Sequence, residues 1–534
     1  MLDEINTWAQ EAYVHFNFLK KMFIMKKYIL ILLLLVCFNE TVKANALAIS
    51  TPQYNHANKT ITFNISWENS WKLSSGPNNW DGVWVFIKRQ ACSNTNIWAS
   101  ALVSTTSADH GTTVASGNNL LSVDAVSDGM GVFIRRTFSG LGSIGTHTVT
   151  LKLDESMTTS PSITTGASDN FKIFGIEMVY VPEGQFYAGD GRQNNTHNFS
   201  NGANAGTPLL ITAQMQTDGL GAATNYTSNP MYGCPNYLPP TFPLGYNGFW
   251  CMKYETTVVS YVDFLNCLSY DQQAIRLAKW SNRYPNSVNS NFTNGQSWRT
   301  SVFTSAAGTY NTIPATFNYN TTYETYSVLG YMSWLDLTAY LDWTGLRPMT
   351  DFEYEKVCRG PLNPIPNEYP WGNTSLTQAS GQPTNFGSFQ ERANQQGEGI
   401  CLYQWNDENR APYRPGIFAT QITTRSQSGS TYYGIMEMGG NVSEQVVGGG
   451  SGYDYSNFTT ANGDGALGVD GNANTTGWPR GIGANQGNYI KGGDYTGNGS
   501  YPNIIQVSDR QYYNGNTINN GQNNGTGGRG VRSF

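Results

Sequence analysis

The chain has 534 residues, of which 13% are charged and 13% aromatic, and its formal net charge at pH 7 is −6. This length is enough for about two or three domains. A mildly acidic chain without a basic run is unlike proteins that bind nucleic acid or anionic membrane surfaces. Its 58 glycines, combined with many aromatic residues, are typical of a loop-rich extracellular protein rather than a disordered one.

The N-terminus has the pattern of an export signal. A basic start at residues 25–27 precedes a short apolar run at 29–38, and small residues suitable for cleavage follow it. We therefore expect residues 1–24 to be a start-site overextension and residues 25–46 to be a signal peptide. The mature protein would be secreted or held at the cell surface. Because the apolar run is too short for a stable anchor, we expect no transmembrane segment in the mature chain.

Residues 47–173 are predicted to form an all-β domain. Apolar and polar residues alternate over 60–67 and, in part, over 82–88, and shorter apolar runs follow at 132–135 and 147–153. Short strands separated by glycine- and asparagine-rich turns favour a β-sandwich of immunoglobulin-like shape. Four tryptophans are interpreted as core residues, with a sugar-binding platform as the alternative: Trp67, Trp71, Trp80 and Trp84.

A strand over residues 171–181 leads directly into a second domain, residues 174–534, so we expect a tight boundary without a flexible linker. Apolar residues have helical spacing at 258–268 and 333–343. Between these helices, residues 282–325 are predicted to be an inserted surface loop. Further segments rich in asparagine and glycine predict long irregular connections: residues 190–245 and 448–534.

Another helix is expected at residues 350–359. Thr350 and Glu353 have the spacing of a capping box, and Asp351 adds negative charge to the first turn. Gly360 ends the helix. Taken alone, this pattern predicts an amphipathic helix within a large domain.

The order of residue types around this helix carries a resemblance. The sequence LRPMTDFEYEKVCRG at 346–360 resembles a signature of the formylglycine-generating enzyme family, also called the sulfatase-modifying factor family. The resemblance extends over roughly residues 176–534. It implies an irregular α+β domain related to the C-type lectin fold. Further blocks follow in the family's order: MVYVPEGQF at 178–186, FWCMKYET at 249–256, SWLD at 333–336, YPWG at 369–372, MEMGGNVSE at 436–444, KGGD at 491–494 and GVR at 530–532.

The resemblance implies an enzyme that oxidises a sulfatase cysteine to formylglycine, using copper(I) held by two cysteines near the C-terminus. Copper(I) prefers soft thiolate ligands. Here Gly497 and Pro502 stand at the two cysteine positions, and Asp494 replaces a serine of the family. No cysteine follows Cys401 and no histidine follows His197. We therefore expect no copper and no catalytic residues at these degenerate positions, and interpret the domain as a pseudoenzyme.

An enzyme of the same superfamily with carboxylate-based chemistry is the alternative. Its site would be a pocket near Asp494, Asp509 and Arg532. Four carboxylates are candidate bases: Glu255, Asp336, Asp494 and Asp509. We favour structural pairing of these groups with four basic residues: Lys253, Arg347, Arg510 and Arg532.

Calcium is a candidate cofactor, because the resemblance implies calcium sites on two loops and hard oxygen ligands on irregular loops suit Ca²⁺. The alternative is that the polar side chains of the second group satisfy backbone groups of their own loop. The first group is Asn385 with the carbonyl of Phe386, and the second is Gly440, Asn441, Val442 and Glu444.

Six cysteines follow the signal, and export makes disulfides possible without fixing their pairing. Cys358 is expected to be a small core residue, since it lies inside the predicted helix. Lipidation of Cys37 stays open, although the preceding Val36 is bulkier than is usual before a lipidated cysteine.

We predict an exported, non-catalytic protein that serves in binding or in assembly. Its partner would be a protein or glycan ligand, or further copies of the chain added at a sandwich edge. No nucleic-acid partner is expected. Tyrosine and asparagine side chains suit adaptable recognition, and the predicted binding surface gathers them after Asp494: Tyr495, Tyr501, Tyr512, Tyr513, Asn514 and Asn523.

Overall fold

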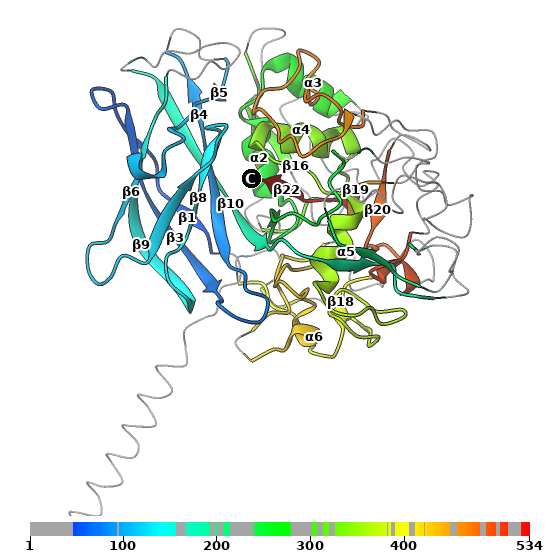
Figure 1. The fold of residues 1–534 in the computed structure, drawn as a ribbon. Coiled ribbons are helices and arrows are strands. Elements are labelled where there is room, and N and C mark those ends of the chain that lie inside the picture. The colour runs from blue at the N-terminus through cyan, green and yellow to red at the C-terminus, as the bar shows by residue number, and fades with distance from the viewer. Residues whose placement is uncertain are drawn as a thin grey trace, which may run out of the picture. The chain divides into compact units, whose positions relative to one another are not determined.

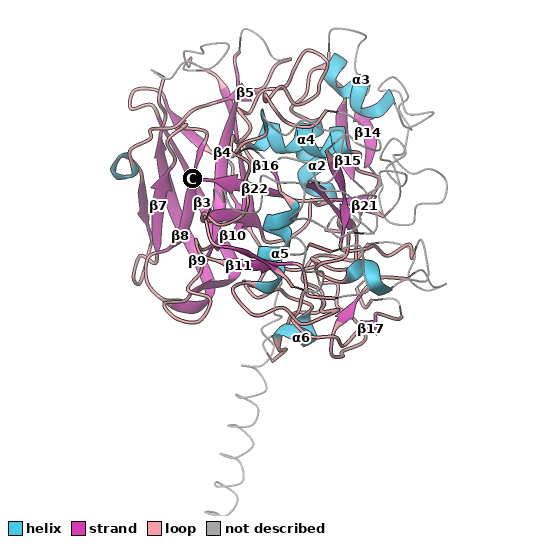
Figure 2. Ribbon diagram, turned by 45° about the vertical axis from the view of Figure 1, so that its right-hand side comes forward, coloured by secondary structure: helices cyan, strands magenta, loops and turns pink. Residues whose placement is uncertain are grey.

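The computed structural model describes residues 46–534 with several gaps, and the expected signal peptide and start-site overextension lie almost wholly outside the described residues. The described part is mostly β with few helices (Figures 1 and 2). None of its helices is long and apolar enough to cross a membrane. The gaps are 93–95, 156–165, 167, 193–197, 200–206, 214–238, 240, 279–301, 307–312, 320–325, 382, 386–389, 405–411, 421, 449–456, 481–486, 498–501 and 511–524.

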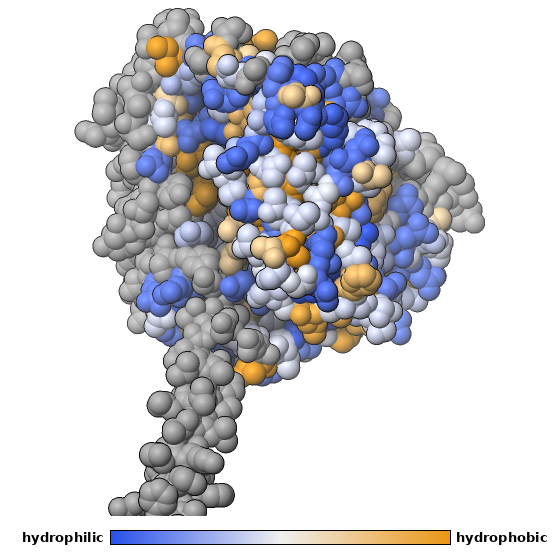
Figure 3. Space-filling model, turned by 90° about the vertical axis from the view of Figure 1, so that its left-hand side faces the viewer, coloured by the Kyte–Doolittle hydropathy of each residue, from blue (hydrophilic) through white to orange (hydrophobic). Residues whose placement is uncertain are grey.

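A five-stranded sheet contains the first strands of the described chain. Its order is β1-β3-β9-β6, and β2 pairs with β3. Alternate residues of β3 are buried in the core, as the sequence pattern predicts, whereas the outer face of the molecule on this side is mostly hydrophilic or neutral (Figure 3). The strands are β1 (Ala48–Ile49), β2 (Gln53–Asn55), β3 (Thr60–Lys72), β6 (Gly111–Thr113) and β9 (Gly140–Lys152).

An eight-stranded sheet runs through both expected domains. Its order is β16-β22-β13-β10-β4-β8-β7, with β5 beside β4. Strand β10 pairs with β4 over residues 170–179 and with β13 over residues 178–181, so it crosses the boundary expected near residue 174. The strands are β4 (Asp81–Gln90), β5 (Ala99–Ser100), β7 (Leu121–Ala125), β8 (Gly131–Arg136), β10 (Asn170–Val181), β13 (Phe249–Met252), β16 (Arg347–Pro348) and β22 (Gly530–Ser533).

Strand β4 is buried on both faces. Val83, Val85 and Ile87 pack in the core shared with the five-stranded sheet, whereas Trp84 and Phe86 pack in the core that contains α2 and α4. A strand covered on both sides needs apolar residues at nearly every position, which explains why its sequence alternates only in part.

Two of the four tryptophans confirm the core interpretation, since the side chains of Trp67 and Trp84 are fully buried. Trp80 and Trp71 are partly buried and pack against core clusters. Trp80 stacks on Tyr180 with ring centres 4.4 Å apart. The indole N–H of Trp71 donates to Asn79 at 3.2 Å. These contacts favour the core interpretation over a sugar-binding platform.

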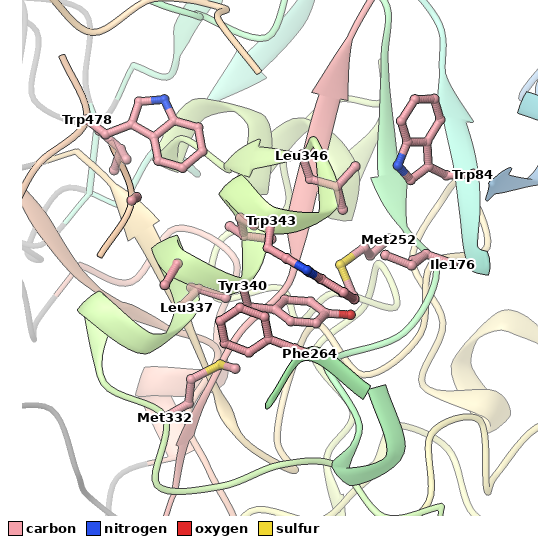
Figure 4. Close-up of a cluster of buried hydrophobic side chains, with 14 of the residues drawn as sticks. Trp84, Ile176, Met252, Phe264, Met332, Leu337, Tyr340, Trp343, Leu346 and Trp478 are labelled. Atoms are coloured by element: carbon pink, nitrogen blue, oxygen red, sulfur yellow. The ribbon is translucent and has the colours of Figure 1, made fainter. Parts of the chain in front are cut away.

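Helices α2 and α4 cover the second face of the eight-stranded sheet. Figure 4 shows Tyr340 and Trp343 of α4 beside Phe264 of α2 and Met252 of β13. The ring centre of Phe264 lies 5.8 Å from that of Tyr340 and 5.4 Å from that of Trp343. The helices are α2 (Val258–Leu265), α3 (Tyr270–Ala278), α4 (Trp334–Thr344), α5 (Asp351–Arg359) and α6 (Arg425–Ser428), with short 3-10 turns η1 (Ser107–Asp109) and η5 (Pro502–Ile505).

Helix α5 begins at the predicted capping box. The Thr350 hydroxyl accepts from the Glu353 N–H at 3.2 Å, and the Glu353 carboxylate accepts from the Thr350 N–H at 2.9 Å. All nine residues of the helix are buried, and Cys358 packs in the core as expected. The expected helix is therefore enclosed on all sides, because neighbouring segments cover its polar face and pair most of its charges.

The insertion at 282–325 is not wholly a surface loop. It contains a hairpin of β14 (Val302–Ala306) and β15 (Thr316–Tyr319). Ala315 and Phe317 are buried in the main core, because alternate residues of this segment point inward. The Asn266 side chain accepts from the Phe317 N–H at 2.8 Å and fixes the hairpin to the end of α2.

Three smaller sheets complete the described chain, and most of the remainder around α6 and β17 is loop (Figure 2). The three-stranded sheet β20-β19-β21 leads into the loop that carries Asp494. Its strands are β19 (Ser443–Val447), β20 (Asn488–Lys491) and β21 (Thr526–Gly527), and the pairs are β11 (Phe186–Ala188) with β12 (Leu209–Ile211) and β17 (Thr377–Gln378) with β18 (Ile400–Cys401).

Candidate functional site

Asp494 lies in the turn that follows β20 and is engaged by its own loop. Its Oδ1 accepts from the backbone N–H of Thr496 at 2.7 Å and also from the Thr496 hydroxyl. Its Oδ2 accepts from the Ser443 hydroxyl at 3.1 Å. Burial raises the pKa of this carboxyl group, and the hydrogen bonds oppose that rise. The side chain therefore stabilises the turn and is closed off from solvent.

The two degenerate positions have no thiol. Gly497 has a φ of 57°, a left-handed conformation that favours glycine. Pro502 begins the 3-10 turn η5. A side chain added at Gly525 would come within 2.3 Å of the Asp494 carboxyl carbon, so this loop packs closely against that carboxylate. The donors expected for copper(I) are therefore absent at both positions.

The described cysteines do not replace the missing pair. All five are free, and four of them are buried. Cys251 and Cys267 belong to different core clusters. Burial raises the pKa of the Cys251 thiol to about 12 and that of the Cys267 thiol to about 11. Neither side chain is a ready thiolate ligand.

The structure does not bring Asp494, Asp509 and Arg532 together as the alternative enzyme would need. The Arg532 guanidinium forms an ion pair with Asp128 at 2.6 Å, in the loop before β8. The backbone carbonyl of Asp509 accepts from Lys491 at 3.1 Å. The contacts of Asp494 are with the separate pair Ser443 and Thr496.

The remaining basic residues pair as we expected, but with other carboxylates. Their buried ion pairs are Lys253 with Glu177 at 3.1 Å and with Asp81 at 3.5 Å, Arg347 with Glu353 at 2.5 Å, and Arg510 with Asp351 at 2.8 Å. Asp336 pairs with Arg276 at 2.9 Å and caps α4. Sequence reasoning predicted pairing but missed these partners, most of which lie far apart along the chain, whereas Arg347 and Glu353 are only six residues apart.

The second group of expected calcium ligands is occupied by protein contacts. Asn441 Oδ1 accepts from the Tyr413 N–H at 2.8 Å, and Asn441 Nδ2 donates to Glu255 at 2.7 Å. Glu444 forms a buried ion pair with Arg529 at 2.6 Å. Asn441 therefore satisfies a loop backbone group, as the alternative expects, and both side chains also bond to other side chains.

The other expected calcium ligands are Gly440, Val442, Asn385 and the carbonyl of Phe386. Gly440 and Val442 use their backbone N–H groups internally, donating to the Gly492 carbonyl and to Glu255. Asn385 lies on an exposed turn with a φ of 51°. Phe386 lies outside the described residues. Calcium stays a prediction for both groups.

A buried acidic cluster was missed by sequence analysis. Glu255, Glu437 and Glu444 lie around one guanidinium, that of Arg529, and all are fully or almost fully buried. Burial raises the pKa of each carboxyl group, to about 7 for Glu437. No sequence pattern indicated this convergence, since Arg529 stands outside the motif positions that we assigned.

The predicted binding surface is corrected at Tyr495. This side chain is only 4% exposed and packs in an apolar cluster with Tyr413 and Leu402. A tyrosine next to a glycine-rich turn has the same appearance in sequence whether it is core or surface. The other predicted surface residues lie outside the described residues: Tyr501, Tyr512, Tyr513, Asn514 and Asn523.

Comparison with known proteins decides the family. A family model described as the sulfatase-modifying factor enzyme 1-like domain matches residues 174–532. The chain belongs to this family. The predicted resemblance is confirmed, and the sulfatase-modifying factor domain includes the Asp494 loop, the acidic cluster and helix α5.

Solved structures similar to this chain include the Major Tropism Determinant U1 and I1 variants. They are 12% and 11% identical to this chain, and each match covers 81% of this chain and 85% of the other with a TM-score of 0.23. A TM-score this low carries no functional information. No curated protein matches the chain.

Proposed function

We propose that this protein is exported and acts by binding, on a sulfatase-modifying factor domain that has lost its copper chemistry. One observation carries the proposal: Gly497 and Pro502 stand where two thiolates are needed, and Asp494 beside them is buried in its own turn. Copper(I) has no soft ligand at these positions. The residual groups stabilise a loop instead of offering a base or a nucleophile.

The proposed partner is a protein, a glycan or another copy of the chain. Strands β6 and β7 stand at edges of the two sheets, and a sheet edge is a place where a further strand can be added. An immunoglobulin-like first domain, with Ca²⁺ at the turn of Asn385, belongs to the same proposal.

The test is an assay of formylglycine formation. The mature chain is incubated with copper(I), oxygen and a cysteine-containing sulfatase peptide, and aldehyde is captured with a hydroxylamine probe. An active member of the family serves as the positive control. We expect aldehyde from the control and none from this protein, whereas turnover by this protein would overturn the proposal.

A further inference from the structure

A cavity of about 870 Å³ lies between the N-terminal strands and the helices of the sulfatase-modifying factor domain. This volume is within the range of sites for small organic ligands. Its walls come from the segment before and in β5, from the turn between α2 and α3, and from a loop at residues 462–469. The Asp494 loop does not line it, so the cavity is separate from the degenerate copper position.

The walls of the cavity are held in place by buried hydrogen bonds. Lys88 of β4 donates to the carbonyls of Trp343 and Gly465, at 2.7 and 2.8 Å, and to the Ser100 hydroxyl at 2.9 Å. Gly465 has a φ of 79°, and a side chain there would come within 2.1 Å of the Ser100 hydroxyl. Asp342 of α4 accepts from the Asp464 N–H at 3.0 Å. The 462–469 loop is therefore fixed both to the strands and to α4.

The cavity combines an apolar wall with an acidic rim. The charged residues that line it are all acidic, namely Asp128, Asp271 and Asp464. Asp128 is paired with Arg532, but no basic residue in the described part of the chain pairs with Asp271 or Asp464. The apolar wall is formed by Ile97, Trp98, Leu102, Met130, Leu268 and Leu467.

The nearest buried cation, Lys88, is attracted to the Asp464 carboxylate but forms no ion pair with it in the described part of the chain. Lys88 uses its three donors on the three wall acceptors described above. Burial also lowers the pKa of Lys88 to about 7, so part of its population is neutral at physiological pH. A cleft lined by one sign of charge concentrates ligands of the opposite sign.

We propose that this cavity binds a small organic amine with an apolar body, an aromatic one above all. The ammonium group would lie between Asp271 and Asp464, and the body would contact the apolar wall that includes Trp98. An anionic ligand of the same size would be repelled by the carboxylates of Asp271 and Asp464. The exposed Ile97 and Val469 at the mouth extend the apolar contact area.

Calorimetric titration of the mature chain with three matched probes tests the proposal. The probes are 2-phenylethylamine, its neutral analogue 2-phenylethanol and the anion 3-phenylpropionate. We expect the amine to bind at least about tenfold more tightly than the alcohol and the anion not to bind, with amine affinity falling as salt rises. Equal or tighter binding of the anion, or no binding of the amine, would overturn the proposal.

Variants assign the binding to this cavity. Asp271→Asn and Asp464→Asn should each weaken amine binding about fivefold, the value of a partly exposed ion pair. Ala466→Trp should abolish it by filling the cavity. The matched control is Glu398→Gln, an exposed acid outside the cavity, which should leave the affinity unchanged. Melting curves establish that each variant is folded, and unchanged affinity in both Asp variants would also overturn the proposal.

Discussion

Arg529 lies at the centre of a buried charged site in the sulfatase-modifying factor domain. Its guanidinium bonds to the Glu444 carboxylate and to the backbone carbonyls of Met252 and Glu437. Glu255 adds a further carboxyl group to the same site. Arg414 acts on Glu437 as a second cation, yet burial raises the pKa of all three carboxyl groups.

Glu437 is one of these three groups, and Glu437→Gln should change the pH dependence of stability. Its pKa is raised from 4.5 to about 7, with burial as the main cause. Between these values the folded state holds a proton that the unfolded state has released, so the free energy of unfolding falls as pH rises, by up to about 3 kcal/mol. In Glu437→Gln this fall in the free energy of unfolding is removed. Urea unfolding at pH 5 and pH 8 measures the difference between the variant and the wild type.

The control for this experiment is Glu398→Gln, which removes an exposed carboxylate. It should retain the wild-type dependence on pH. A Glu437→Gln variant whose stability falls between pH 5 and pH 8 as steeply as that of the wild type would contradict the assignment.

At the scale of elements, a buried ion triad joins β4, β10 and β13. Lys253, directly after β13, lies 3.1 Å from Glu177 of β10 and 3.5 Å from Asp81 of β4. Asp81 also accepts from the Trp67 indole N–H at 3.1 Å and the Ser70 hydroxyl at 2.8 Å. The triad therefore connects the sulfatase-modifying factor domain to both N-terminal sheets.

Lys253→Met should destabilise the protein by about 3–5 kcal/mol, because it leaves two buried carboxylates without a cation. Thermal and urea unfolding measure the loss. Adding Glu177→Gln should recover part of it, since one of the two charges is then removed. The matched control is Lys59→Met, which breaks a partly exposed pair with Glu155 at 3.4 Å and should cost less than about 1 kcal/mol. A loss in Lys253→Met no larger than in this control would contradict the role of the triad.

Local elements could be predicted from the sequence, but their partners could not. The strand alternation at 60–67 and the Thr350–Glu353 capping box depend on residues a few positions apart, and both were confirmed. The pairs Arg532–Asp128 and Lys253–Asp81 join residues that are distant along the chain. Side-chain type alone does not determine which distant residues form an ion pair.

At the scale of the whole molecule, the described chain after residue 46 is organised by one shared sheet. Strand β10 supplies hydrogen bonds to β4 on one side and to β13 on the other. Its sequence predicts a strand but contains no information about how many neighbours that strand has. The walls of the cavity beside β5 come from segments of both expected domains.

The loss of copper chemistry is the central claim, and competition for copper(I) with a chromogenic chelator tests it most directly. Two proteins are compared, and both carry Cys92→Ser and Cys234→Ser, which remove the exposed thiol of Cys92 and the thiol of Cys234. One of them also carries Gly497→Cys and Pro502→Cys. We predict that the double cysteine variant withdraws copper(I) from the chelator and that the protein without it does not. Equal withdrawal by the two proteins would contradict the account.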